Sequence, residues 1–282
     1  MLDVELSGPP DGHAVVVHSG TPGAAMLFEP LVEVGTERGF RHVSYSRPGY
    51  GGSDRHEGRT VADCAADLTA ILDHLGIERC FTIGGSGGGP HALACAALLP
   101  ERTIAAATIA GVAPWPADGL DWLEGMGQEN HDEFAAALEG GDRLREFLET
   151  EAEQLLTVRG DELHAALGDL LSGVDRAVLT GDFADYMTAS DREALGNGVW
   201  GWFDDDRAFV TSWGFELDAI EVPVTVWQGD QDRFVPAAHG RWLAEHISGA
   251  RAELRADQGH LSLALGAYGE ILDDLLVSSL QS

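Results

Sequence analysis

The sequence predicts an α/β fold, a mostly parallel, doubly wound sheet with an inserted helical lid. Short apolar segments alternate with amphipathic helical segments through most of the chain, and this alternation is typical of a parallel sheet covered by helices. Strand signals stop between residues 115 and 214 and then resume. We therefore expect residues 1–114 and 215–282 to form the core and residues 115–214 to form the lid.

The first predicted elements of the core lie in residues 14–75. Residues 14–17 and 42–45 are short segments typical of strands, and residues 26–38 form a helical segment between them. In residues 60–75 apolar side chains recur at helical spacing, and Gly76 directly after them is a typical helix C-cap. This order predicts the first strand, helix, strand unit of the sheet.

The sequence Gly84-Gly85-Ser86-Gly87-Gly88 lies between a predicted strand and a predicted helix. Residues 80–83 before it are apolar, residues 90–99 after it are rich in Ala and Leu, and a further strand is predicted at 103–109. Strand, Gly-x-Ser-x-Gly and helix together form a nucleophile elbow, in which only small residues fit around the serine. The turn holds the serine hydroxyl clear of the sheet, beside a helix N-terminus that favours negative charge.

Aromatic residues gather near the two ends of the predicted lid. They are Trp115, Trp122, Trp200, Trp202 and Trp213. Apolar pockets are common where a lid meets a core, so we predict that these side chains bind substrate. The alternative is that they hold the lid against the core.

The predicted sheet resumes after the lid. Residues 222–227 and 252–255 are strand segments, whereas residues 237–247 and 267–280 are helical segments. Parallel strands of an open sheet present the loops at their carboxyl ends along one edge, where ligands bind. The loops that follow these two strands should therefore lie near the elbow.

Those two loops carry the remaining groups that a serine nucleophile needs. Asp230 and Asp232 follow the first strand, and His260 follows the second. A serine hydroxyl reacts only when a base removes its proton and an acid orients that base, and at this kind of elbow the chain order is Ser, acid, His. We predict Ser86 as nucleophile, His260 as base and an aspartate as acid. The alternative interpretation is that these are turn aspartates and a surface histidine.

An oxyanion hole needs two backbone N–H donors near Ser86. Gly87, directly after the nucleophile, supplies the first. The second should come from the loop after strand 14–17. We predict Thr21, with Gly20 as the second choice, because Pro22 has no N–H.

Four motifs resemble those of the α/β-hydrolase superfamily, and the resemblance extends over nearly the whole chain outside the lid. His18-Ser19-Gly20-Thr21-Pro22-Gly23 resembles the family's His-Gly-x-Pro-Gly loop, with Ser19 as an extra residue. Ser46-Arg47-Pro48-Gly49-Tyr50-Gly51-Gly52-Ser53 resembles its Asp-x-Arg-Gly-x-Gly-x-Ser element, with Ser46 in place of the acid. Gly229 to Pro236 resembles the acid loop, and Gly259-His260 resembles the terminal histidine motif.

The resemblance implies a doubly wound sheet of the α/β-hydrolase type, with Asp232 as the acid in preference to Asp230. Serine at the elbow, where some branches have aspartate, argues against haloalkane dehalogenases and epoxide hydrolases. The chain is most similar to lidded serine esterases and proline-iminopeptidase-like hydrolases. No metal or organic cofactor is implied.

Composition limits the partners. The 282 residues carry a formal net charge of −30, and all 17 basic residues are arginines. Such a surface repels nucleic acid and anionic membranes, so we expect a small-molecule substrate and a monomer or homodimer. Three cysteines and an acidic N-terminus without a signal-peptide pattern predict a cytoplasmic protein.

We therefore predict a serine hydrolase that cleaves an ester, thioester or lactone of a small, largely apolar substrate through an acyl-enzyme. A second hypothesis is an aminopeptidase, which needs lid carboxylates to hold an α-ammonium group. The third is a non-hydrolytic small-molecule receptor on the same fold. The lid carboxylates available to the second hypothesis are Glu149, Glu151, Glu153, Asp204, Asp205 and Asp206.

Overall fold

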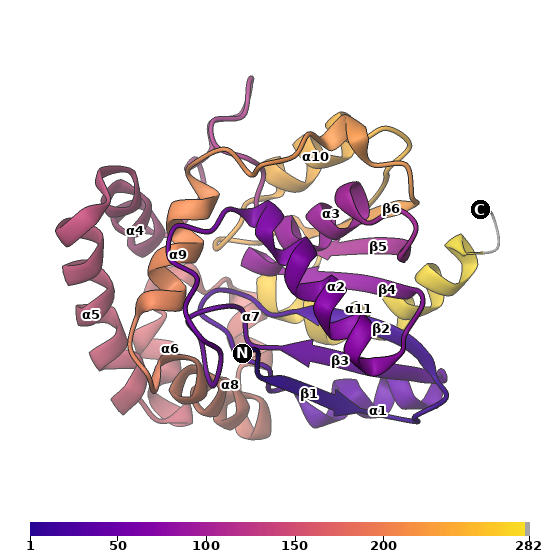
Figure 1. Ribbon diagram of the computed structural model, residues 1–282. Helices are drawn as coiled ribbons and strands as arrows, with labels where there is room; N and C mark the ends of the chain where they lie inside the picture. The colour runs from indigo at the N-terminus through magenta and orange to yellow at the C-terminus, as the bar shows by residue number, and fades with distance from the viewer. Residues whose placement is uncertain (280–282) are drawn as a thin grey trace.

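A seven-stranded sheet with the order β1-β3-β2-β4-β5-β6-β7 forms the centre of the protein (Figure 1). The computed structural model describes residues 1–279. β1 pairs with β3 in the antiparallel direction, and every other pair in the sheet is parallel. The strands are β1 (Val4–Ser7), β2 (His13–His18), β3 (Phe40–Tyr45), β4 (Cys80–Gly85), β5 (Thr103–Ile109), β6 (Val224–Gly229) and β7 (Arg251–Arg255).

Helices cover both faces of the sheet (Figure 1). On β2, Val15 packs in a buried cluster with Leu272 of α11, whereas its neighbour Val16 packs in the opposite cluster with Leu68 of α2 and Leu93 of α3. Both faces of the strands are therefore buried, which explains their nearly continuous apolar sequences. The helices are α1 (Glu29–Glu37), α2 (Cys64–Leu75), α3 (Gly89–Leu98), α10 (Ala237–His246) and α11 (His260–Ser278).

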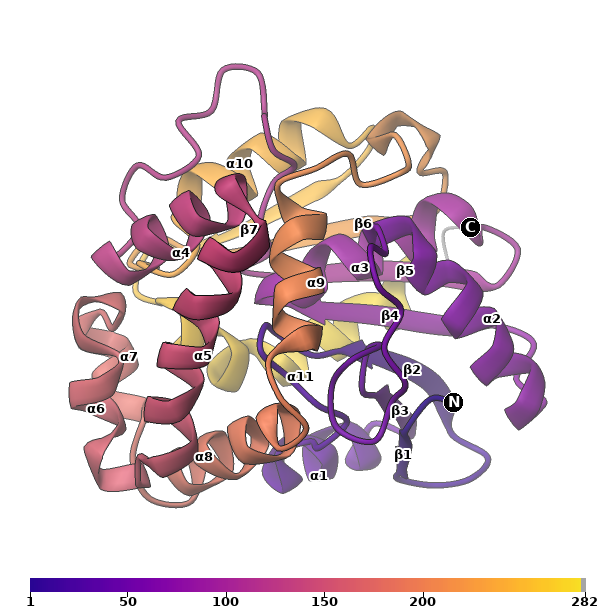
Figure 2. The same cartoon turned by 60° about the vertical axis from the view of Figure 1, so that its left-hand side comes forward.

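The chain between β5 and β6 is helical and lies beside the carboxyl ends of the strands (Figure 2). We call residues 115–214 the inserted segment. It packs on the core through buried side chains such as Phe134, Leu144 and Phe209, which belong to the same cluster as Leu68 and Leu93. Its helices are α4 (Gln128–Glu139), α5 (Gly141–Thr157), α6 (Leu163–Ala166), α7 (Gly173–Val178), α8 (Gly181–Leu195) and α9 (Trp200–Phe209).

The predicted α/β fold with a mostly parallel sheet is confirmed, and two elements differ from the prediction. β1 was not predicted, because its sequence Val-Glu-Leu-Ser is short and half exposed. The terminal helix begins at His260, not at residue 267, and the predicted end at residue 280 lies outside the described residues. Among residues 1–279, no helix is long and apolar enough to span a bilayer.

Candidate active site

Ser86 occupies a strained turn between β4 and α3. Its backbone φ is +52°, a left-handed conformation that is unusual for a residue other than glycine. A Cβ atom at Gly84 would lie 2.1 Å from the Gly88 carbonyl oxygen, and one at Gly88 would lie 2.1 Å from the His18 carbonyl oxygen. The two glycines are therefore required for the chain to turn back so closely after the strand.

Asp232 and His260 form a buried pair next to this turn. The His260 Nδ1 and Asp232 Oδ2 atoms are 2.7 Å apart. The other carboxylate oxygen of Asp232 accepts hydrogen bonds from the backbone N–H groups of Phe234 at 2.9 Å and Val235 at 2.8 Å. Asp230 is instead on the surface, where it pairs with Arg241 at 2.6 Å. Of the two aspartates, the structure thus places Asp232 against the histidine.

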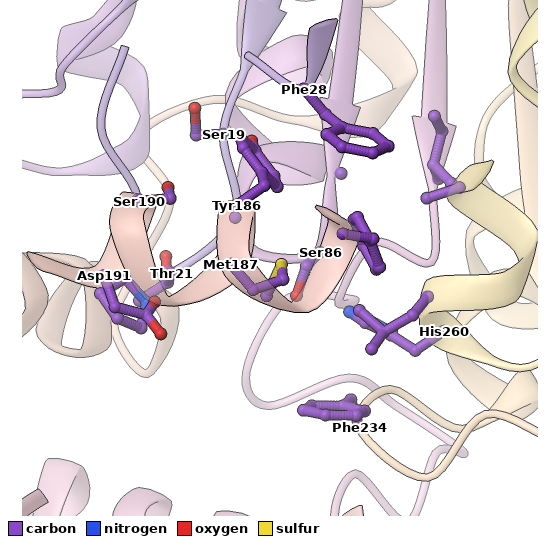
Figure 3. Close-up of a pocket in the computed structure, with 18 of the residues that line it drawn as sticks. Ser19, Thr21, Phe28, Ser86, Tyr186, Met187, Ser190, Asp191, Phe234 and His260 are labelled. Atoms are coloured by element: carbon purple, nitrogen blue, oxygen red, sulfur yellow. The ribbon is translucent and has the colours of Figure 1, made fainter. Parts of the chain in front are cut away.

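The imidazole of His260 is directed toward Ser86 (Figure 3). Burial lowers the pKa of His260, but the charge and hydrogen bond of Asp232, together with the charge of Asp175, more than offset this effect, so the pKa is raised above 6.5. Phe234 stacks on the ring with 4.7 Å between centroids. Figure 3 shows the ring pointing toward Ser86 across the same cavity. Asp232 and Phe234 thus hold the ring in one orientation.

The loop after β2 lies against the turn that contains Ser86. A Cβ atom built on Gly20 would lie 3.5 Å from the Ser86 Cβ, and one built on Gly87 would lie 2.3 Å from the Thr21 Oγ1. The structure therefore brings Gly20, Thr21 and Gly87 together beside Ser86. The assignment of their N–H groups to an oxyanion hole stays a prediction.

A buried ion pair holds this loop in place. Arg47 donates hydrogen bonds to the Ser19 carbonyl at 2.6 Å and to the Gly20 carbonyl at 2.8 Å. Asp205 of α9 binds the Arg47 guanidinium and accepts the hydroxyl hydrogen of Thr21 at 2.7 Å. Arg47, which the sequence identifies only as part of the motif at residues 46–53, therefore ties the loop after β2 to α9 of the inserted segment.

Asp205 is fully buried and surrounded by cationic groups. Besides Arg47, it pairs with Arg59 at 2.7 Å and accepts a hydrogen bond from Tyr50 at 3.0 Å. Burial raises the pKa of Asp205, but the charges of Arg47 and Arg59 outweigh it and hold the pKa well below its usual range. The carboxylate of Asp205 is thus bound by side chains of the protein itself and does not face the cavity.

A cavity of about 320 Å³ opens above Ser86, between the core and the inserted segment. Its walls are largely apolar and include Phe28, Leu163, Phe183, Met187 and Leu265. Figure 3 shows Ser86 between His260 on one side and Ser190 and Asp191 on the other.

Of the five predicted tryptophans, Trp202 lines this cavity, and the other four do not. Trp122 is buried in the core, with its Nε1–H donated to the Ala113 carbonyl and its ring against Trp115. Trp213 is buried in the core, and Trp200 is 38% exposed, with Arg55 over its ring. The structure therefore brings none of these four to the cavity, and packing within the protein accounts for them; substrate contact stays a prediction for Trp202.

Three carboxyl groups that sequence reasoning missed line the cavity. Burial raises the pKa of Glu129, Glu133 and Asp191 to about 7. The described lining residues include no arginine. With 47 acidic residues in the chain, nothing in the sequence distinguished these three. None of the six lid carboxylates selected from the sequence lines the cavity; these are Glu149, Glu151, Glu153, Asp204, Asp205 and Asp206.

Neither a metal site nor a disulfide was found in residues 1–279. No group of three or more His, Cys, Asp or Glu side chains there is arranged to hold a metal ion. Cys64, Cys80 and Cys95 are free and buried.

Comparison with known proteins places the chain among hydrolases. A family model described as the alpha/beta hydrolase fold matches residues 13–267. A 2-hydroxy-6-oxononadienedioate/2-hydroxy-6-oxononatrienedioate hydrolase of Paraburkholderia phymatum is 26% identical over 87% of this chain and 80% of its own length. A non-heme chloroperoxidase of Streptomyces lividans is 27% identical over 98% of this chain and 94% of its own length. The enol-lactonase of Burkholderia xenovorans has the same fold, with a TM-score of 0.67 and 21% identity over 98% of this chain and 96% of that chain.

Proposed function

Because this chain belongs to the α/β-hydrolase fold family, we propose that it is a serine hydrolase with Ser86, His260 and Asp232 as its catalytic triad. Its relatives support a hydrolase in general terms. The observation that carries the finer proposal is the buried Asp232–His260 pair, whose side chains are 2.7 Å apart, because its histidine lines the same cavity as Ser86 in its strained turn.

The proposed reaction proceeds through an acyl-enzyme. His260 removes the Ser86 proton as the serine oxygen attacks the substrate carbonyl, and Asp232 stabilises the imidazolium that forms. N–H groups of Gly87 and of Thr21, or Gly20 in its place, hold the oxyanion. His260 then protonates the leaving group and later activates the water that releases the acid.

The cavity favours a small, largely apolar acyl group. Its volume of about 320 Å³ is at the lower end of the range for ligand pockets, and its walls are mostly aliphatic and aromatic. A dicarboxylate such as the one named for the Paraburkholderia relative is disfavoured, because three carboxyl groups and no arginine are among the lining residues that the structure describes. An uncharged ester, thioester or lactone fits the apolar and carboxyl-bearing cavity wall better than a dicarboxylate does.

The same wall favours a second candidate, an aminopeptidase or another hydrolase of amine-bearing substrates. Glu129, Glu133 and Asp191 lie on the inserted segment and line the cavity that contains Ser86. An ammonium group among them would gain charge-assisted hydrogen bonds.

The cytoplasmic location and the state as a monomer or homodimer remain predictions.

Steady-state hydrolysis of p-nitrophenyl esters from acetate to decanoate, beside a set of aminoacyl anilides, tests the proposal. Wild type and Ser86→Ala are compared. Ester turnover that disappears in the variant supports the proposed triad, and the chain-length optimum measures the cavity. Preferential anilide turnover supports the aminopeptidase. Folded wild-type protein that turns over neither set contradicts a simple esterase and an aminopeptidase, and favours a specialised lactonase, a lyase or a non-hydrolytic receptor.

A further inference from the structure

The helix that begins with His260 has its N-terminus capped by another part of the chain. The first residues of a helix have backbone N–H groups without partners inside the helix. In α11 these donors bind the carboxylate of Asp175. Its Oδ2 accepts from the His260 N–H at 3.0 Å, and its Oδ1 accepts from the N–H groups of Leu261 and Ser262, both at 2.9 Å.

Asp175 belongs to α7 of the inserted segment, which lies beside the start of α11 (Figure 2). The residue is fully buried, and Ser172 donates its hydroxyl hydrogen to Asp175 Oδ2 at 2.7 Å. The carboxylate therefore accepts four hydrogen bonds, three of them from the backbone around His260.

Gly259 makes this contact possible. A Cβ atom at position 259 would lie 2.2 Å from Asp175 Oδ2 and 2.6 Å from Ser172 Oγ. Any side chain there would push Asp175 away from the helix. Packing against Asp175 and Ser172 therefore requires a glycine at position 259, independently of the chemistry of His260.

We propose that Asp175 is a positioning residue for His260, through which the inserted segment fixes the catalytic base and stabilises its protonated form. This inference rests on the proposed serine hydrolase. Asp232 binds the ring at Nδ1, and Asp175 binds the backbone N–H of the same residue. His260 gains a positive charge when it takes the Ser86 proton, and a second buried carboxylate beside it favours that state.

Three substitutions loosen this contact to different degrees. Asp175→Asn removes the charge and keeps an acceptor oxygen, Asp175→Ala removes both, and Ser172→Ala removes only the hydroxyl that holds Asp175. Asp63→Asn is the matched control. Asp63 also caps a helix, accepting from the Thr60 N–H at 2.7 Å and the Thr60 hydroxyl at 2.9 Å, but it lies outside the cavity.

Two measurements distinguish an effect of Asp175 on His260 from a general loss of protein stability. NMR titration gives the pKa of the His260 ring, with its resonance assigned by comparison with His260→Ala. The rate of Ser86 labelling by a fluorophosphonate, measured as a function of pH, reports how well His260 removes the Ser86 proton. We expect the pKa to fall by about 0.5–1 in Asp175→Asn. We expect the labelling rate to fall about tenfold in that variant, more in Asp175→Ala and less in Ser172→Ala.

An unchanged His260 titration and labelling profile in Asp175→Asn, with a melting temperature lowered only as in Asp63→Asn, would overturn the inference. If Asp175→Ala does not fold, Asp175→Asn and Ser172→Ala still carry the test. If wild type hydrolyses no ester or anilide, the proposed function fails separately, because the NMR titration needs no turnover.

Discussion

Thr21 donates its hydroxyl hydrogen to Asp205 at 2.7 Å, although 184 positions separate the two residues in the sequence. Thr21 lies in the loop beside Ser86, and Asp205 lies in α9 of the inserted segment. The loop proposed to hold the oxyanion is therefore fastened to the part of the chain that covers the cavity. Under the proposed function, a change in the inserted segment at Asp205 should also disturb the loop beside Ser86.

Asp205→Ala should destabilise the protein by about 3–5 kcal/mol, because it leaves the buried Arg47 and Arg59 charges without their partner. Urea unfolding measures this loss. Asp73→Ala is the control, since its ion pair with Arg102 is on the surface and should change stability by less than about 1 kcal/mol. Equal effects in the two variants would show that the buried pair is unimportant.

The pH dependence of kcat/KM should report His260. The base acts when neutral, and its pKa is raised above 6.5, so we expect activity to rise with pH through a midpoint above 6.5. Asp232→Asn should lower the midpoint and reduce kcat about 10³–10⁴-fold. Asp230→Asn, which changes the surface pair with Arg241, should do neither. A larger loss in Asp230→Asn would reverse the assignment of the acid.

Asp191 should make the protein less stable as the pH rises toward 8. Burial raises the pKa of its carboxyl from 3.8 to about 7, although Arg192 partly opposes this, so the folded state holds the proton more tightly than the unfolded state. The stability due to the protonated form is present at low pH and is lost as the pH rises through about 7.

Between pH 5.5 and 8, wild type should therefore lose about 2 kcal/mol more unfolding free energy than Asp191→Asn. Denaturant unfolding at several pH values measures the difference. Asp182→Asn, on the exposed side of the same helix, should follow wild type. Parallel curves for wild type and Asp191→Asn would contradict the raised pKa.

Trp202→Phe should change substrate preference. Trp202 lines the cavity and donates its Nε1–H to Glu133 at 2.7 Å, so the smaller ring enlarges the cavity and removes this hydrogen bond to the carboxylate. We expect KM for the longer p-nitrophenyl esters to change about threefold to tenfold. Trp213→Phe should leave the chain-length profile as it is, because Trp213 is buried in the core away from the cavity. The same shift in both variants would point to a general loosening.

The parts of the site that depend on local sequence could be predicted. Ser86 stands in a turn that only small neighbours permit, and Asp232 and His260 follow strands whose carboxyl ends meet at one edge. The choice of Asp232 over Asp230 was different. Both residues are turn aspartates after the same strand, and it was family resemblance, not spacing, that selected Asp232.

The parts that depend on packing between distant segments could not be predicted. The sequence predicts that the terminal helix begins at residue 267, whereas α11 begins at His260, because the group that caps it, Asp175, is 85 positions away in the sequence. Trp122 and Trp202 are both aromatic residues of the inserted segment, yet the first packs in the core and the second lines the cavity. The residue type is the same in the two cases, and only the folded structure shows which of the two lines the cavity.

Asp175 and Asp205 have a consequence for attempts to change specificity by transplanting the inserted segment from a relative. Such an exchange would replace the residues that line the cavity on the side of the inserted segment. Here the segment also supplies the cap of the His260 helix and the counter-charge for Arg47. A donor segment without carboxylates at these two places would change the cavity wall. It would also remove the contacts that position His260 and the loop around Thr21. A useful chimera would have to keep both aspartates with their partners.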